Sequence, residues 1–392
     1  MAHLLLLLIY ITFISLGLPD ALLGSAWPNM HVDLNVPISY AGFISVTITV
    51  GTIISSIFSA KLNRKFGIYV VFFSVALTAL ALFGFSISTK FYMLILFAIP
   101  YGLGAGGIDS ALNNYVAKHY KANHMSWLHS MWGIGFTVGP YVMGFVLTNN
   151  NPWNDGYKII SLIQVCILVI LILSIPLWRK QMKINEEEGL TEEKVTFKEV
   201  FKTKGVLVLL ITFFCYCALE QTTALWATTY LVEKINIDAN TAAYFASLFC
   251  IGITVGRVIN GFIAMKLKDR QMIRIGIGII LMGIILVLIN VNTFISYAGF
   301  VLIGIGCAPI YPSVIHSIPR YFGKISSTLI GVAMASAYLG VMVMPPLFGV
   351  IAQYVTVNIL PFYLLGLLII LYFGHEILLK KVKISYDFKM ED

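Results

Sequence analysis

The sequence predicts an all-α membrane protein in which twelve transmembrane helices form two pseudo-symmetric six-helix bundles. Composition is the first reason: of the 392 residues, 59% are hydrophobic and 11% are charged, and the mean hydropathy is +0.88. Soluble chains carry roughly 25% charged residues, so this chain cannot cover its surface with groups that suit water. In addition, apolar runs of about 20 residues, the length that crosses a bilayer, recur throughout, and short motifs repeat between the halves.

Polar residues divide the chain into twelve apolar runs. The first run follows Met1 almost directly and lacks the basic stretch of a cleavable signal, so we expect it to be retained as a helix. The runs lie near 4–27, 39–59, 68–88, 91–117, 126–147, 157–178, 205–231, 241–264, 271–291, 295–318, 326–352 and 358–379.

One long polar segment separates these runs into two groups of six. It covers 179–204 and contains a cluster of three consecutive glutamates that begins at Glu186. We therefore predict an N-terminal six-helix bundle at 1–178, a cytoplasmic linker at 179–204, and a C-terminal six-helix bundle with a short cytoplasmic tail at 205–392.

The basic residues predict the orientation in the membrane. With a cytoplasmic N-terminus, only Lys90, Lys158 and Lys234 fall in outer loops, and Arg257 falls within a span. The other 22 of the 26 lysines and arginines then lie on the cytoplasmic side, as the positive-inside rule requires. We expect a multi-pass protein of the plasma (inner) membrane with both termini in the cytoplasm. Basic cytoplasmic loops account for the net charge of +8, so we expect no nucleic-acid partner.

Motifs recur in the same order in both halves, which predicts the pseudo-symmetry. Three recur 205 residues apart and one 202 apart: Ile48–Gly51 with Ile253–Gly256, Lys61-Leu62 with Lys266-Leu267, Gly135, Pro140 and Gly144 with Gly340, Pro345 and Gly349, and Gly102-x-Gly104 with Gly304-x-Gly306. In membrane proteins built from repeated halves, a substrate site lies where the repeats meet, near the middle of the bilayer.

Motifs of enzymes are missing from the sequence. It has no nucleophile elbow, zinc-ligand cluster or Walker motif, and its glycine run at 102–107 lacks the ending of a phosphate loop. The five cysteines lie in apolar runs and form no C-x-x-C pair, so we expect inert thiols and no metal site. The glycine run is expected to allow close helix packing, and the chain is predicted not to be an enzyme.

Four ionisable residues lie well inside spans. They are Asp20 in the first span, Asp109 in the fourth, Glu220 in the seventh and Arg257 in the eighth. A charge at the bilayer centre costs roughly 2.5–3.5 kcal/mol on insertion scales, so such a group must be paired, hydrated or neutralised. We predict that one or more of the three acids exchanges a proton, and that Asp20 and Glu220 also contact substrate. The alternative is a static ion pair or a packing hydrogen bond, and for Arg257 we favour a structural or gating ion pair.

Polar and aromatic residues near these acids are candidates for substrate binding. Trp27 and Trp226 follow Asp20 and Glu220 toward the outer face, as interfacial anchors or as platforms for a sugar ring. Asn113 lies one helical turn after Asp109, so both can face one cavity. The remaining candidates are His129, which could instead cap the fifth span, and Trp132, Gln164, Gln221 and Tyr311.

Several of these motifs resemble those of a known family. The loop from Ala60 to Gly67 looks like the major facilitator signature between the second and third helices, with Lys61 and Arg64 as gating or structural residues. It departs from that signature in having Ala60 where glycine is usual and Arg64 where an acid is usual. The motifs that resemble the fucose–galactose–glucose proton symporter branch are Gly17-Leu18-Pro19-Asp20 with Gly24 and Trp27-Pro28, the glycine run ending in Asp109, Glu220 with Trp226, Gly256-Arg257 with Gly261, and Ala308-Pro309-Ile310-Tyr311-Pro312.

The resemblance implies a role for two of the acids. In that branch, an aspartate of the first helix and an acid of the fourth take part in proton coupling and sugar binding, which corresponds to Asp20 and Asp109 here. Two sugar-contacting positions differ, because Gly17 stands where the branch has asparagine and His129 where it has glutamine. Fucose is therefore not implied as the ligand.

The sequence thus predicts proton-coupled symport of a sugar or similar small polar solute by alternating access. We expect a monomer in the lipid bilayer, with a small-molecule substrate and with the proton as coupling ion in place of any cofactor. The alternative is proton-driven efflux of drugs or metabolites, because Gly135-x-x-x-Gly139-Pro140-x-x-x-Gly144 partly resembles the antiporter motif of efflux carriers. A sensor that binds without transport is disfavoured, because the linker and the tail contain no signalling domain.

Overall fold

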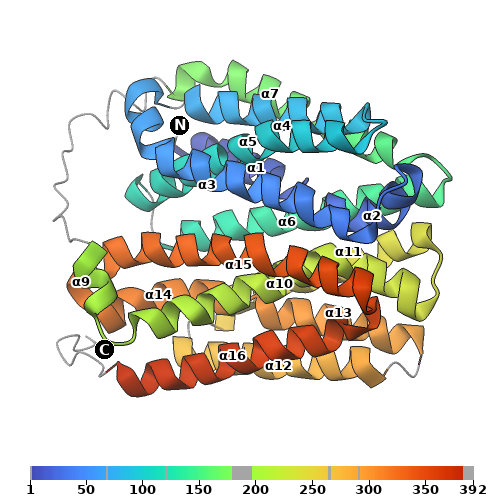
Figure 1. The fold of residues 1–392 in the computed structure, drawn as a ribbon. Helices are drawn as coiled ribbons and strands as arrows, with labels where there is room; N and C mark the ends of the chain where they lie inside the picture. Colours follow the sequence, from blue (N-terminus) through green and yellow to red (C-terminus); the bar gives the residue numbers. More distant parts are fainter. Residues whose placement is uncertain are drawn as a thin grey trace. The chain divides into compact units, whose positions relative to one another are not determined.

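A computed structural model describes residues 2–67, 69–119, 122–178, 197–263, 266–289 and 292–382. Within these ranges every regular element is helical, and twelve segments are long and apolar enough to cross a membrane (Figure 1). The predicted all-α membrane fold with twelve spans is confirmed.

Most spans begin and end near their predicted residues. The first is longer than predicted: it runs from Leu4 to Asp33, because the helix continues through Pro28 instead of ending near Trp27. The helices of the first half are α1 (Ala2–Gly17), α2 (Leu22–Asp33), α3 (Ala41–Phe66), α4 (Tyr69–Ser86), α5 (Phe91–His119), α6 (Ala122–Thr148) and α7 (Trp153–Leu173). Those that follow are α9 (Phe197–Lys202), α10 (Val206–Ile235), α11 (Ala239–Ile263), α12 (Asp269–Ile289), α13 (Thr293–Cys307), α14 (Ile310–Phe322), α15 (Ser326–Tyr354) and α16 (Leu360–Lys381).

The chain forms two compact units. Unit 1 comprises Met1–Leu190, Ala224–Ile251 and Gly349–Asn358, and unit 2 comprises Thr191–Thr223, Gly252–Phe348 and Ile359–Asp392. The predicted bundle boundaries at 178 and 205 stay a prediction, and most of the predicted linker, 179–196, lies outside the described ranges.

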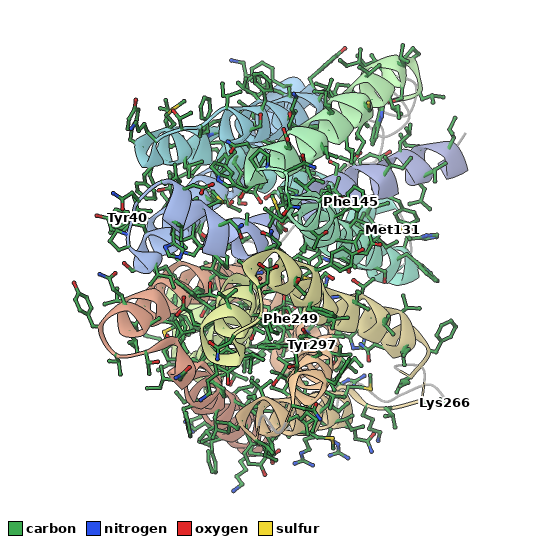
Figure 2. All side chains as sticks on the ribbon, turned by 90° about the vertical axis from the view of Figure 1, so that its right-hand side faces the viewer. Tyr40, Met131, Phe145, Phe249, Lys266 and Tyr297 are labelled. Atoms are coloured by element: carbon green, nitrogen blue, oxygen red, sulfur yellow. The ribbon has the colours of Figure 1, made fainter. Side chains whose placement is uncertain are left out.

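Apolar side chains cover the outside of the helices as well as their contacts. Figure 2 shows this coat of largely carbon side chains, and Phe145, labelled there, is 57% exposed. In water such a surface would be unfavourable, but hydrocarbon surroundings suit it. Apolar side chains of the spans therefore face two kinds of apolar surroundings: neighbouring helices on one side and lipid on the other.

Glycines bring the helices of unit 1 into close contact. A Cβ atom on Gly102 of α5 would lie 2.1 Å from the Ile48 carbonyl oxygen of α3, and one on Gly104 would lie 2.5 Å from the Ser74 carbonyl oxygen of α4. Small residues allow this approach between membrane helices. The glycine run of α5 therefore serves helix packing, as predicted.

Unit 1 also contains the ends of three helices from later in the chain. A Cβ on Gly24 of α2 would lie 2.3 Å from the Ala224 carbonyl oxygen of α10. The Asn29 amide donates a hydrogen bond of 2.9 Å to the Asn240 side chain at the start of α11. These contacts attach the C-terminal part of the first span to α10 and α11.

Two of the twelve spans are interrupted helices. The first span is broken between α1 and α2, at residues 18–21, and the tenth is broken between α13 and α14 at Ala308-Pro309. A proline stands in each break, and proline cannot donate a backbone hydrogen bond to the preceding turn. The first break places Asp20 where the backbone leaves the regular helix.

The close approach of α5 to α3 can be tested by adding one methyl group. Gly102→Ala should lower the unfolding temperature of the purified protein, because overpacking typically costs about 1–3 kcal/mol. Gly278→Ala is the matched control, since a Cβ there meets nothing within 4 Å. Equal unfolding temperatures for the two variants would contradict this packing.

Candidate functional site

The Asp20 carboxyl group is held by two uncharged donors. The Tyr101 hydroxyl of α5 donates to Oδ1 at 2.9 Å, and the Trp132 indole N–H of α6 donates to Oδ2 at 2.8 Å. None of the ion pairs found in the described ranges includes Asp20. Both carboxyl oxygens are therefore hydrogen-bonded, with no cation from the described residues in direct contact.

Close packing of α1 on α6 sets this geometry. A Cβ on Gly17 would lie 2.1 Å from the Trp132 carbonyl oxygen, and one on Gly135 would lie 2.0 Å from the Ile14 carbonyl oxygen. The two backbones are thus near enough for the Trp132 indole to reach Asp20. An asparagine in place of Gly17, as in the symporter branch, would not fit this packing.

Aromatic rings continue the site along α6. Trp132 stacks on Phe136 with ring centroids 4.5 Å apart, and His129 makes an edge contact with Phe13 of α1 at 5.9 Å. The idea that His129 caps the helix is wrong, because α6 already begins at Ala122. Substrate contact by His129 stays a prediction.

The predicted pair on the fourth span is formed. The Asn113 side-chain amide of α5 donates a hydrogen bond of 2.7 Å to Oδ1 of Asp109. Both side chains are partly buried, so they share one face of α5 as the spacing of four residues indicates. Their roles in proton and substrate binding stay predictions.

Glu220 has a different environment in unit 2. Its side chain is buried, Oε2 accepts a hydrogen bond from the Tyr216 hydroxyl, and Oε1 lies 3.9 Å from Nη2 of Arg257. The Tyr216 hydroxyl is also 3.0 Å from the Cys307 carbonyl oxygen. Glu220 therefore faces a cation, whereas Asp20 is bonded to neutral groups.

The remaining candidates on unit 2, Gln221 and Tyr311, belong to α10 and α14. The Tyr311 hydroxyl lies 3.1 Å from the sulfur of Met334, and its ring centroid is 5.3 Å from that of Phe213. Gln221 is half-buried beside Glu220. Binding of substrate by Tyr311 and Gln221 stays a prediction.

Three candidates lie fully inside the protein. Trp27 and Trp226 have no exposed surface, and the Trp27 indole donates to the Ile38 carbonyl oxygen at 2.7 Å. The interpretation of these tryptophans as interfacial anchors is wrong, because an anchor presents its ring to the membrane surface. Gln164 of α7 is also fully buried and donates through Nε2 to the Ser15 carbonyl oxygen of α1.

Two tyrosines that hold the acids were not predicted from the sequence. Tyr216 stands four residues before Glu220, a spacing that places both on one helix face and could have revealed it. Tyr101 comes from a different helix than Asp20 and stands next to the glycine run, so no spacing rule indicates their contact.

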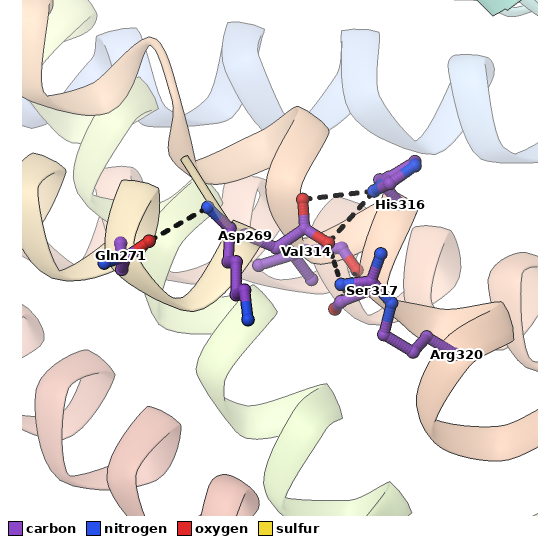
Figure 3. A network of polar contacts seen from close by, with 7 residues as sticks. Asp269, Gln271, Val314, His316, Ser317 and Arg320 are labelled. Atoms are coloured by element: carbon purple, nitrogen blue, oxygen red, sulfur yellow. Dashed lines mark hydrogen bonds and ion pairs between the residues drawn. The ribbon is translucent and has the colours of Figure 1, made fainter. Parts of the chain in front are cut away.

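An ion-pair contact that was not predicted from the sequence occurs at the start of α12. Asp269 lies 3.0 Å from Nδ1 of His316 and 3.6 Å from Nη1 of Arg320 (Figure 3). It stands 205 residues after Arg64, the position where the family signature usually has an acid. The repeat therefore carries this acid in the second half, while the side chains of Lys61 and Arg64 lie outside the described part of the chain.

A family model described as Major Facilitator Superfamily matches residues 9–290 and 209–383. The chain therefore belongs to the Major Facilitator Superfamily, and it is a multi-pass membrane transporter rather than an enzyme.

Individual relatives are distant. "Bypass of stop codon protein 6" of Saccharomyces cerevisiae is 21% identical over 90% of this chain and 77% of that protein. "Glucose/mannose transporter GlcP" of Bacillus subtilis is 23% identical, covering 82% of this chain and 81% of that one. The crystal structure of a D-xylose-proton symporter superposes with a TM-score of 0.76 over 98% of this chain and 99% of that chain, at 12% identity. At such identity, the structural likeness concerns the fold alone.

The contact between Glu220 and Arg257 can be tested by a double substitution. Arg257→Leu should lower the unfolding temperature strongly, because breaking a buried ion pair costs about 3–5 kcal/mol. In Glu220→Gln/Arg257→Leu, no carboxylate is left unpaired, so most of the loss should be recovered. A double variant as unstable as Arg257→Leu would contradict the pairing.

Proposed function

We propose that this transporter is a symporter that couples a proton to a sugar or a similar small polar solute by alternating access. Support comes from the relative that is named as a glucose/mannose transporter. The single observation that carries the proton claim is the Asp20 carboxyl between the Tyr101 hydroxyl and the Trp132 indole.

The two donors around Asp20 are chemically unequal. An indole N–H can only donate, whereas a phenol hydroxyl can donate or accept. A proton that binds Asp20 can therefore sit on Oδ1, with the Tyr101 hydroxyl turning from donor to acceptor, while Trp132 continues to donate to Oδ2. Asp20 can thus change its charge without losing either hydrogen bond.

Glu220 is less suited to exchange the proton. Its carboxyl group forms an ion pair with Arg257, whose Nη2 lies 3.9 Å from Oε1, and taking up a proton would break that pair. We infer that Asp20 carries the transported proton and that Glu220 with Arg257 acts as an ion pair that substrate or conformational change can reorganise.

Substrate recognition is proposed to involve the groups near these acids. The half-buried indole of Trp132 contacts Asp20 and stacks on Phe136. Tryptophan offers both an apolar ring face and a donor, a combination suited to a sugar, which has apolar C–H faces and hydroxyl groups. Asn113, next to Asp109, supplies an amide for hydroxyl groups.

The cellular setting is part of the same proposal. We place the transporter in the plasma (inner) membrane, and the basic residues favour both termini in the cytoplasm by the positive-inside rule. We propose a monomer that uses no cofactor beyond the proton.

The glycine motif that suggested efflux has another explanation in the structure. Gly135 and Gly139 of α6 pack against the carbonyl oxygens of Ile14 in α1 and of Leu18 in the break that follows it, where a Cβ would lie 2.0 Å away in each case. Helix packing next to Asp20 therefore accounts for the motif, and efflux is retained only as an outcome of the tests.

Asp20→Asn should abolish proton-driven accumulation of the sugar in proteoliposomes, because the amide cannot take up a proton. Exchange of labelled for unlabelled D-glucose or D-mannose across the membrane should persist, since it needs no net proton transfer. Glu233→Gln, at an exposed acid near the end of α10, is the control and should accumulate sugar like the wild type. Proton-driven accumulation by Asp20→Asn would contradict the proposal, and proton-driven export of hydrophobic cations in place of sugar uptake would favour efflux.

Trp132→Phe should move the pH dependence of sugar uptake. Uptake falls as the external pH rises, because the carrier must load a proton. Loss of the indole donor disfavours the carboxylate and so favours the protonated acid, which moves the half-maximal pH upward. A hydrogen bond to a charged group contributes about 1.5–3 kcal/mol, so the shift should be about one pH unit or more. An unchanged or lower half-maximal pH, measured in proteoliposomes, would contradict this role.

A further inference from the structure

The break in the first span leaves one backbone carbonyl without its usual partner. In a regular helix, the N–H of residue 19 would bond to the carbonyl oxygen of Ser15. Residue 19 is proline, which has no N–H. The Ser15 carbonyl is therefore freed inside a span, where water cannot replace the missing donor.

Gln164 supplies the missing donor. Its side chain comes from α7, is fully buried, and donates through Nε2 to the Ser15 carbonyl oxygen. The other end of the amide, Oε1, has no hydrogen-bond partner in the described part of the chain. Because a carbonyl oxygen can only accept a hydrogen bond, the NH₂ end of the amide must face Ser15. This single contact therefore fixes the orientation of the amide.

The turn that follows carries Asp20. The Asp20 N–H bonds to the Gly17 carbonyl and the Leu22 N–H bonds to the Pro19 carbonyl, each at 3.2 Å. These bonds span three residues instead of four, so the chain tightens here into a single 3₁₀-like turn. Gln164 anchors the residue that begins this bend, one turn before the acid.

We infer that Gln164 is a positioning residue that replaces the N–H lost at Pro19 and so holds Asp20 between Tyr101 and Trp132. This assigns Gln164 a role other than the substrate contact predicted from the sequence. The inference rests on the proposed function only where it concerns the proton on Asp20, because the hydrogen bond itself can be tested without transport.

A double-mutant cycle tests the hydrogen bond. Gln164→Met removes the donor at similar side-chain length and should lower the unfolding temperature of the purified full-length protein by roughly 2 °C or more. In Pro19→Ala, the backbone N–H of residue 19 can again reach the Ser15 carbonyl, so adding Gln164→Met should cost little or nothing. Equal losses in both backgrounds would overturn the inference.

A second measurement asks whether Gln164 acts on Asp20. The infrared carbonyl band of a protonated carboxylic acid, identified by its loss in Asp20→Asn, reports the protonation of Asp20 as the pH is raised. Gln164→Met should shift the midpoint of this band upward, in the same direction as Trp132→Phe. Combined with Trp132→Phe, it should add less than it does alone, because the Trp132 hydrogen bond that it weakens is already lost. An unshifted midpoint, or full additivity, would overturn the positioning role.

Ser161→Ala is the matched control. Ser161 stands one turn before Gln164 on α7 and also donates to a buried backbone carbonyl, that of Ala79 at 3.1 Å, but on α4 instead of α1. It should lower the unfolding temperature without shifting the Asp20 midpoint and without any dependence on Pro19→Ala. A shift in this variant equal to that of Gln164→Met would overturn the specific role.

The outcomes separate this inference from the proposed function. If Asp20→Asn loses no infrared carbonyl band, the proposal that Asp20 carries the proton fails. The double-mutant cycle of Gln164 and Pro19 then still tests the hydrogen bond to the Ser15 carbonyl. If the band titrates with pH but its midpoint is the same in Gln164→Met as in the wild type, only the positioning role of Gln164 fails. Should Gln164→Met give no folded protein, recovery of folding in Pro19→Ala/Gln164→Met supports the inference, and no recovery overturns it.

Discussion

A broken helix inside a membrane must have its free backbone groups satisfied by the protein, because the hydrocarbon supplies no water. The first span meets this constraint at Pro19, where the Ser15 carbonyl loses its helical donor and gains the amide of Gln164. The bend permits a carboxyl group, Asp20, to leave the helix and reach Tyr101 and Trp132. Close packing of α1 on α6 through glycines completes the arrangement. The site is thus a consequence of how one proline is accommodated.

Asp20 and Glu220 stand in different surroundings. Within the described part of the chain, Asp20 accepts hydrogen bonds from two neutral donors, and the proposed proton exchange depends on Tyr101, the donor that can reverse its hydrogen bond. Glu220 instead lies beside a cation, Arg257, and neutralising the acid would break that ion pair. The halves of this transporter therefore resemble each other in sequence but not in the chemistry of their acids. The acid found at Asp269, and not at Arg64, is a second asymmetry of this kind.

Hydropathy predicted the spans well because the bilayer imposes a length and an apolar composition on each of them. Spacing along one helix also predicted the contact of Asp109 with Asn113. Contacts between helices were harder to predict from the sequence, because they depend on how each helix is rotated about its own axis and so on which side faces its neighbour. The partnership of Asp20 with Tyr101, the burial of Trp27 and Trp226, and the bond from Gln164 to Ser15 all depend on that rotation. From the sequence, Gln164 was predicted to contact substrate, because a glutamine in an apolar run needs a polar partner; the contact found in the structure is with the Ser15 carbonyl.

The most direct test of this account is to count the protons bound by the purified transporter as the pH is changed, in the wild type, Asp20→Asn and Glu220→Gln. The account predicts that Asp20→Asn lacks about one proton of the wild-type titration between mildly acidic and mildly alkaline pH, whereas Glu220→Gln keeps it. A missing proton in Glu220→Gln alone, or identical curves for Asp20→Asn and the wild type, would contradict the assignment of the transported proton to Asp20.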